Sequence, residues 1–202
     1  MLRHDRTRRD LLRLGALGLG ALALDLPGLM PVAHALGPGS ELDIGELHLP
    51  SGTVSRPRAW ERLLYEVIQT TSVEANPVAR QVEPESAALF AHPFCVLVGD
   101  GALPALSDAA VEQLQRFLAY GGFLFIDDTT GSVDGPFAQS VRVLVRRLFP
   151  TRPMAPLPGD HSVYRAFFLL DAALGRLGRH GYLEGVSVGS TTPLIYCPSD
   201  LS

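Results

Sequence analysis

Two fully apolar segments with a helical pattern between them most restrict how this chain can fold. Phe94–Val98 and Phe123–Ile126 contain no polar residue, which is typical of strands covered on both faces. Between them, Ser107 is a suitable helix N-cap, apolar residues recur at helical spacing, and Gly121 can end the helix in a left-handed conformation. A strand, a helix and a strand joined by short loops predict a right-handed parallel crossover.

The same alternation continues on both sides of this unit. Pro57–Thr70 carries a helical apolar stripe, and another helix is expected from Pro136 to Phe149. Further short elements are expected as strands at 46–49, 78–82, 186–188 and 194–197 and a helical turn at 85–90. A hairpin around Gly189 would join the last two strands. The prolines that follow residue 150 should exclude regular structure there: Pro153, Pro156 and Pro158.

This order of elements predicts a single α/β domain. Strands that alternate with helices favour an open, mostly parallel sheet with helices on both faces. We therefore expect a three-layer fold of the flavodoxin-like or amidotransferase-like kind. The domain should occupy residues 36–202.

The first 35 residues predict an export signal. Arg8 and Arg9 lie in a pattern that resembles the twin-arginine motif, and a short apolar stretch follows from Leu14 to Leu24. Ala33-His34-Ala35 is a small-x-small cleavage site, so we expect cleavage after Ala35. A disordered basic tail or an uncleaved anchor is the alternative. The mature chain should reach the periplasm or cell envelope without a transmembrane span.

Charge and composition argue against several functions. Five of the 17 basic residues and three of the 21 acids precede residue 36, which leaves 12 bases, 18 acids and a net charge of −6. No basic patch of the kind that binds nucleic acid is present. The sequence contains no lysine, which excludes a Schiff-base lysine and the lysine of a phosphate-binding loop. Cys95 and Cys197 lie in apolar runs, and we expect free buried thiols rather than a disulfide.

Two adjacent carboxylates, Asp127 and Asp128, end the second apolar run. Open α/β sheets place their ligand sites at the carboxyl ends of strands. Three interpretations fit this position. The acids could cap the following turn, hold a cation, or perform acid–base chemistry with His161 as their partner.

The cation interpretation rests on the loop Asp128–Ser132. Its sequence, Asp-Thr-Thr-Gly-Ser, resembles the D-x-[S/T]-x-S loop of von Willebrand factor A domains. There a carboxylate and two hydroxyls hold a hard divalent ion, which implies Asp128, Thr130 and Ser132 as ligands of Ca²⁺ or Mg²⁺. In those domains the loop follows the first strand, whereas several elements precede it here.

Three other residues are candidates for the same crevice. Asp160 and His161 lie together in an expected irregular loop, where they could be ligands, an oriented base, or part of a surface turn. Asp200 follows the last expected strand and could join the acids.

Several segments together resemble the bacterial family called domain of unknown function 4159, over most of residues 44–201. They are Ala91–Gly99, Leu118–Leu124, Asp127-Asp128, Leu148–Pro150 and Leu157–His161. The resemblance implies no established activity. It implies a fold like that of class I glutamine amidotransferases, and members that continue beyond Asp200, so we expect a domain shortened at its C-terminus.

The amidotransferase triad itself is absent. The resemblance places the catalytic cysteine at Asp127 or Asp128, and neither a G-x-C-x-G elbow nor a Glu two residues after His161 is present. We do not expect glutamine hydrolysis.

The sequence thus predicts an exported, non-catalytic binding or scaffolding module of the cell envelope, with an unidentified protein or small-molecule ligand. The alternative is a divalent-metal-dependent hydrolase that uses Asp127, Asp128, Asp160 and His161.

Overall fold

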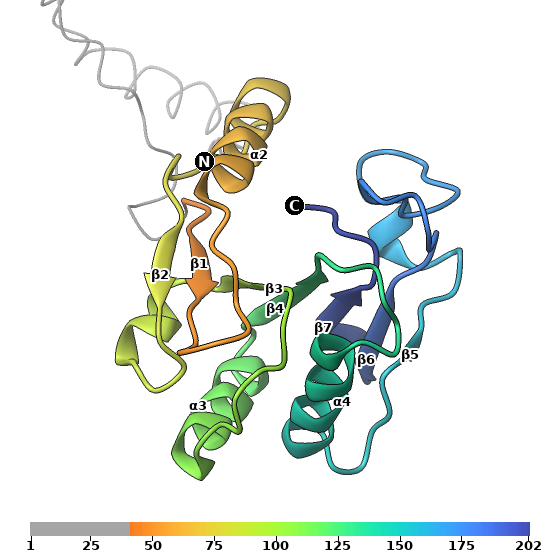
Figure 1. Ribbon diagram of the computed structural model, residues 1–202. Coiled ribbons are helices and arrows are strands. Elements are labelled where there is room, and N and C mark those ends of the chain that lie inside the picture. Colours follow the sequence, from red (N-terminus) through yellow and green to blue (C-terminus); the bar gives the residue numbers. More distant parts are fainter. Residues whose placement is uncertain (1–40) are drawn as a thin grey trace, which may run out of the picture. The chain divides into compact units, whose positions relative to one another are not determined.

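Seven strands form one sheet in the computed structural model, which describes residues 41–202 (Figure 1). The strands are β1 (Ile44–Leu47), β2 (Arg80–Val82), β3 (Phe94–Gly99), β4 (Phe123–Asp128), β5 (Ala155–Pro156), β6 (Glu184–Val188) and β7 (Thr191–Cys197). The helices are α2 (Pro57–Thr70), α3 (Asp108–Ala119) and α4 (Pro136–Leu148), with short 3-10 turns η2 (Ala87–Ala91) and η3 (Ser162–Tyr164). Arg8, Arg9 and the expected cleavage site after Ala35 lie outside the described residues.

The strand order is β2-β1-β3-β4-β7-β6-β5. The first five strands in this order are parallel, whereas β6 is antiparallel to β7 and β5 is antiparallel to β6. The parallel part has the flavodoxin-like order, and the order reverses between β1 and β3. The prediction of an open, mostly parallel three-layer α/β fold is confirmed.

The two faces of the sheet are covered by different elements (Figure 1). Helices α3 and α4 lie on one face, where Phe117, Phe137 and Leu144 belong to the largest buried apolar cluster. Helix α2 lies on the other face, where Trp60 and Leu64 pack on β1 and β3. Beside α2, the long segment between β5 and β6 covers β4 and β7 with a third apolar cluster.

Local signals set most helix boundaries. The Ser107 hydroxyl accepts the Ala110 N–H at the start of α3, as expected of an N-cap. Gly121 follows α3 with a φ of 97°, a conformation that glycine adopts at little cost. Pro57 and Pro136 each begin a helix, at the position where the missing N–H has no helical partner.

The expectation of no regular structure around Pro156 is wrong. Ala155–Pro156 forms the two-residue strand β5 at the edge of the sheet. An edge strand tolerates proline, because an outward-facing N–H has no ladder partner to lose. The hairpin around Gly189 is confirmed, although β6 begins earlier than its apolar run, with the buried Glu184. Arg142 of α4 pairs with Glu184 in a bidentate contact at 2.9 and 3.0 Å.

Candidate functional site

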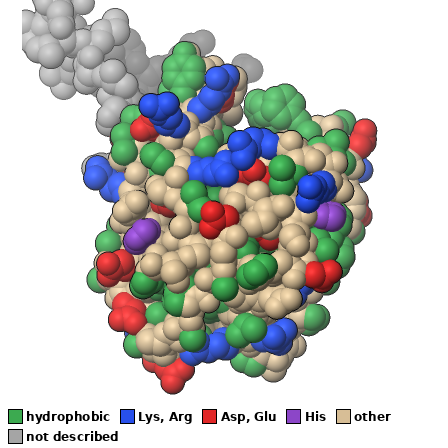
Figure 2. Space-filling model, viewed as in Figure 1, with side chains coloured by type: hydrophobic (Ala, Val, Ile, Leu, Met, Phe, Trp, Pro, Cys, Tyr) green, Lys and Arg blue, Asp and Glu red, His purple; other side chains and the backbone are tan. Residues whose placement is uncertain are grey.

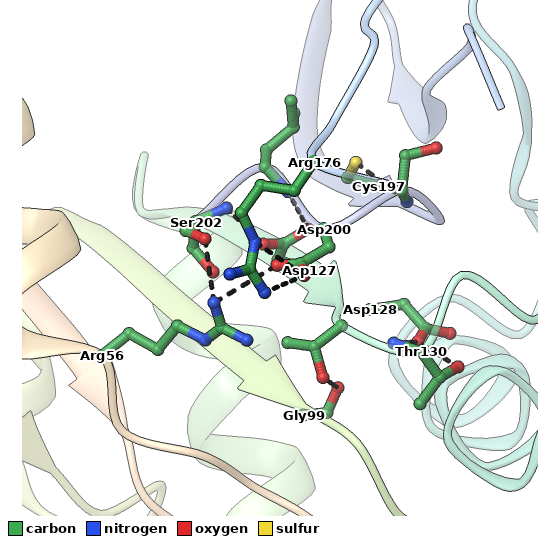
Figure 3. A network of polar contacts seen from close by, with 12 residues as sticks. Arg56, Gly99, Asp127, Asp128, Thr130, Arg176, Cys197, Asp200 and Ser202 are labelled. Carbon is green, nitrogen blue, oxygen red and sulfur yellow. Dashed lines mark hydrogen bonds and ion pairs between the residues drawn. The ribbon is translucent and has the colours of Figure 1, made fainter. Parts of the chain in front are cut away.

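Asp127 and Asp128 end β4, and the side chains of both are fully buried (Figure 3). Successive residues of a strand point to opposite faces of the sheet. Asp128 therefore contacts Tyr196 of the α3–α4 face, while Asp127 lies on the α2 face beside Cys197. The two carboxylates do not form a pair that could share a proton, so the paired-acid interpretation loses its geometric basis.

The Asp128 carboxylate is engaged on both oxygens. Oδ1 accepts the Thr130 N–H at 2.8 Å and the Thr130 hydroxyl at 2.7 Å, and Oδ2 accepts the Tyr196 hydroxyl at 2.9 Å. Burial, and then the neighbouring Asp128 carboxylate, raise the pKa of Tyr196, so its hydroxyl stays protonated and donates. The Thr130 hydroxyl also accepts the Ser132 N–H. These contacts are those of a capped turn.

The Asp127 carboxylate holds the segment that follows β7. Oδ1 accepts the Leu201 N–H at 3.0 Å, and Oδ2 accepts the Ser202 N–H at 2.8 Å. The segment therefore crosses the end of β4 and removes Asp127 from solvent.

Two arginines complete this polar cluster (Figure 3). Arg176 pairs with Oδ2 of the buried Asp200, and Arg56 lies 3.4 Å from Oδ1. Arg56 also donates to the Ser202 carbonyl at 3.0 Å. Asp200 has a positive φ of 59°, a conformation that Asp adopts more readily than most residues. Asp200 joins the acids at the carboxyl edge, as the sequence predicted, but it does so as an ion-pair partner.

Sequence reasoning missed Glu46, Arg56 and Arg176. Glu46 lies in β1 at 5% exposure, where it accepts the Ser55 hydroxyl at 2.6 Å and the Arg56 N–H at 2.7 Å. A carboxylate thus satisfies the start of α2, where the N-cap side chain makes no capping bond, and this contact positions Arg56. A lone acid within a buried strand was the available signal for Glu46.

His161 lies near the amino end of β7, whereas the acids lie at the carboxyl ends of the strands. Its Nε2 is 2.9 Å from the Thr192 hydroxyl, and its Nδ1 accepts the Val163 N–H at 3.2 Å. Thr192 is the second residue of β7, whereas Asp127 pairs with Cys197 at the end of that strand. Five residues of strand correspond to roughly 17 Å, so the structure does not bring His161, or the exposed Asp160, to Asp127.

Among the described residues, no group of three or more His, Cys, Asp or Glu side chains is arranged to hold a metal ion. Asp128, Thr130 and Ser132 do lie together, but the Thr130 hydroxyl donates to the carboxylate. The von Willebrand-like loop would have to exchange these internal contacts for an ion.

A cavity of about 510 Å³ lies at the carboxyl ends of β1 and β2, the same end of the strands that carries the acids. The loop between β3 and α3 forms its other wall, so the cavity lies next to the point where the strand order reverses. Its polar lining residues are His48, Glu83, Glu85 and Ser107. Open α/β sheets bind their ligands at this point, and the volume is typical of a small-molecule site.

The two thiols are free and buried, as expected. Burial raises the pKa of Cys95 to about 12, and burial together with Asp127 and Asp200 raises that of Cys197 to about 12. A thiol with such a pKa is protonated at neutral pH, so neither is an activated nucleophile.

The strand order, and the polar cluster at the carboxyl ends of the strands, are those of a doubly wound α/β domain. The chain belongs to the family described as domain of unknown function (DUF4159), whose family profile matches residues 43–202. The resemblance predicted from the sequence is thereby confirmed at the level of the family. Curated proteins give no match. No helix within residues 41–202 is long and apolar enough to cross a membrane.

Proposed function

We propose that this chain is an exported, non-catalytic binding module of the cell envelope. One observation carries the proposal. An α/β enzyme would hold its reactive groups at the carboxyl ends of the strands, but here the acids at those ends bind other groups of the same chain. Asp127 binds two backbone N–H groups, Asp128 binds a turn and a tyrosine, and Asp200 binds arginines. A general base or a metal ligand needs a lone pair that faces substrate.

The hydrolase alternative required Asp160 and His161 to join these acids. Their position away from the carboxyl ends of the strands removes that support. The likeness to class I glutamine amidotransferases stays a prediction about the fold. It carries no activity here, because the position expected for the catalytic cysteine is Asp127 or Asp128.

The ligand site that fits this proposal best is the cavity beside β1 and β2. Its walls are mostly apolar, from residues such as Leu49, Pro84 and Leu106, and Glu83 and Glu85 supply negative charge. A ligand with an apolar body and a cationic or hydrogen-bond-donating group would match this lining.

Isothermal titration calorimetry with Ca²⁺, Mg²⁺, Mn²⁺ and Zn²⁺ separates the two functions. The non-catalytic module should bind none of these ions with a Kd below about 1 mM, which corresponds to about 4 kcal/mol. Asp128→Asn is the control, since it removes the charge that any ion in this loop requires. Tighter binding by the wild type that disappears in Asp128→Asn would restore the metal-dependent alternative.

The cavity can be tested with Ala105→Trp, because Ala105 is exposed and lines the cavity. In a screen of amphiphilic amines by thermal melting, hits that stabilise the wild type should not stabilise this variant. Ala109→Trp, on the exposed start of α3 outside the cavity lining, is the matched control. Hits that stabilise all three proteins equally would place binding elsewhere.

Export can be tested by replacing Arg8 and Arg9 with lysine. The twin-arginine receptor should reject this pair, so the variant should stay in the cytoplasmic fraction. Continued export would rule out the twin-arginine route.

A further inference from the structure

The segment between β5 and β6 exposes a run of four large apolar residues. Phe167, Phe168, Leu169 and Leu170 are 64%, 68%, 80% and 47% exposed. Leu174 and Leu177 of the same segment are also exposed, at 64% and 38%. Scattered exposed apolar residues are ordinary, but a contiguous group marks an interaction surface. We call residues 165–180 the apolar loop.

The base of the apolar loop is fixed. Tyr164 is 4% exposed, its carbonyl accepts the Leu170 N–H at 2.8 Å, and its hydroxyl accepts the Leu183 N–H at 2.8 Å. At the far end, the Ser199 hydroxyl donates to the His180 carbonyl at 2.6 Å. The rings of Phe167 and Phe168 pack edge to face at 4.7 Å. The exposed side chains therefore project from an anchored support.

Charge separates the apolar loop from the rest of the domain. The loop carries Arg165, Arg176 and Arg179 against one acid, Asp171, a net charge of +2. The remaining residues of 41–202 carry nine arginines and 17 acids, a net charge of −8. Within residues 41–202, no acid lies within ion-pair distance of Arg165 or Arg179, whereas Arg176 pairs with Asp200. Arg165 donates from Nε to the Gly159 carbonyl at 3.3 Å, and the side chains of Arg165 and Arg179 are both exposed. Their remaining N–H groups can meet an anionic partner.

Neighbouring α2 extends this surface. Its exposed residues include Arg58 and Tyr65, while Arg62 pairs with Glu66 at 3.5 Å. Arg56, just before α2, shares Asp200 with Arg176 of the apolar loop. Figure 2 shows arginine side chains among apolar ones along the upper side of the molecule. Apolar side chains flanked by guanidinium groups match the depth profile of a lipid surface, with acyl chains below and phosphates above.

We propose that the apolar loop docks this protein on an anionic lipid bilayer. Phe167–Leu170 enter the boundary between headgroups and acyl chains, and Arg165 and Arg179 contact lipid phosphates. Phenylalanine and leucine supply the apolar contact, while long arginine side chains reach the headgroups. The docking goes beyond the proposed function and does not depend on it, because a catalytic protein could be held at a membrane in the same way.

Vesicle co-sedimentation of the full chain tests the proposal. Wild type should bind vesicles with about one third phosphatidylglycerol more tightly than pure phosphatidylcholine vesicles, and added salt should weaken this binding. Phe168→Ser/Leu169→Ser should lower the affinity at least about tenfold. Tyr120→Ser/Val143→Ser removes two comparably exposed side chains, one just after α3 and one in α4, and should leave the vesicle affinity unchanged. Unchanged melting temperatures would show that both double variants are folded.

A fluorescent probe separates docking by the loop from binding by any other part of the chain. Leu169→Cys carries a reactive thiol for an environment-sensitive dye, since Cys95 and Cys197 are buried. Dye emission should shift to the blue on anionic vesicles, and a dye at Val143→Cys should not shift. Arg165→Glu/Arg179→Glu should reduce the shift at position 169.

Three results would overturn the proposal. They are equal binding to both kinds of vesicle, a serine double variant that binds as wild type does, and a dye at position 169 that stays in water on vesicles. If the same serine variant instead abolished a dimer seen by analytical ultracentrifugation and left vesicle binding intact, the loop would contact a second copy of this chain.

Discussion

The two faces of the sheet are closed by different kinds of interaction. On the α3–α4 face, large side chains such as Phe117 and Phe137 form a continuous apolar cluster under two regular helices. On the α2 face, β4 and β7 are covered by a long irregular segment that individual polar contacts hold in place. Tyr164 and Asp200 make such contacts with this segment, and Asp127 makes them with the residues that follow β7 and lie beside it.

This difference separates non-directional from directional stabilisation. Apolar burial depends on volume and area, so the α3–α4 face should respond most to the loss of side-chain size. The irregular segment depends on donors and acceptors in fixed positions, so it should respond to substitutions that keep size and change hydrogen bonding.

The largest effect is expected for Phe137→Ala. Phe137 is fully buried, and its ring lies so close to Gly99 that an added Cβ would approach it to 2.0 Å. Rigid backbone on that side should prevent collapse of the cavity, so the unfolding free energy should fall by about 3–5 kcal/mol. Chemical denaturation measures this loss. Phe167→Ala, in the exposed apolar loop, should change stability by no more than about 0.5 kcal/mol, and a comparable loss there would contradict the comparison.

An intermediate effect is expected for Asp127→Asn, which keeps size and removes one acceptor. Both oxygens of Asp127 accept backbone N–H groups that cannot reverse their role. An asparagine NH₂ must therefore face one of these donors, and we expect a loss of about 1–3 kcal/mol.

Asp128→Asn should cost less than Asp127→Asn. The asparagine oxygen can still accept both contacts from Thr130, and its NH₂ can donate to the Tyr196 hydroxyl, which can also accept. The loss should be about 1 kcal/mol or less, the value of an ordinary cap. Thermal and denaturant unfolding of both variants gives the order directly. Equal losses would mean that the Tyr196 hydroxyl cannot rotate.

The sequence predicted the regular layer well because its signals are local. Burial of both strand faces makes β3 and the first four residues of β4 apolar, and one-sided burial gives α2, α3 and α4 their stripes. The short strand β5 was missed, because two residues at a sheet edge carry no periodic signal.

The site was predicted only in part. The position of Asp127 and Asp128 at the end of a central strand follows from local pattern, and the alternation of a strand would also have separated their faces. The contacts of Asp200 and the place of His161 depend on where the segment between β5 and β6 runs. No short-range pattern encodes that path, and long-range polar contacts such as Arg176 with the buried Asp200 fix it.

One thiol from each face allows a kinetic comparison that leaves global stability unchanged. Cys95 belongs to the α3–α4 cluster, and Cys197 belongs to the cluster under the irregular segment. Burial raises the pKa of each to about 12 from a usual value of 9.0. Alkylation at pH 8 therefore requires local opening of the fold. Above about pH 9 the unfolded state loses the thiol protons that the folded state keeps, so stability falls as pH rises and the measurement belongs below that value.

Cys197 should be alkylated roughly tenfold faster than Cys95 in the native protein, which corresponds to an opening free energy lower by about 1.4 kcal/mol. The reason is that a few polar contacts hold the cover of Cys197, whereas whole helices cover Cys95. Tyr164→Phe removes the acceptor of the Leu183 N–H and should accelerate alkylation of Cys197 while leaving Cys95 unchanged. Mass spectrometry of tryptic peptides gives both rates from one sample. Equal rates in the wild type, and equal acceleration in Tyr164→Phe, would mean that the two faces open as one unit and that the irregular segment is as firmly held as the helices.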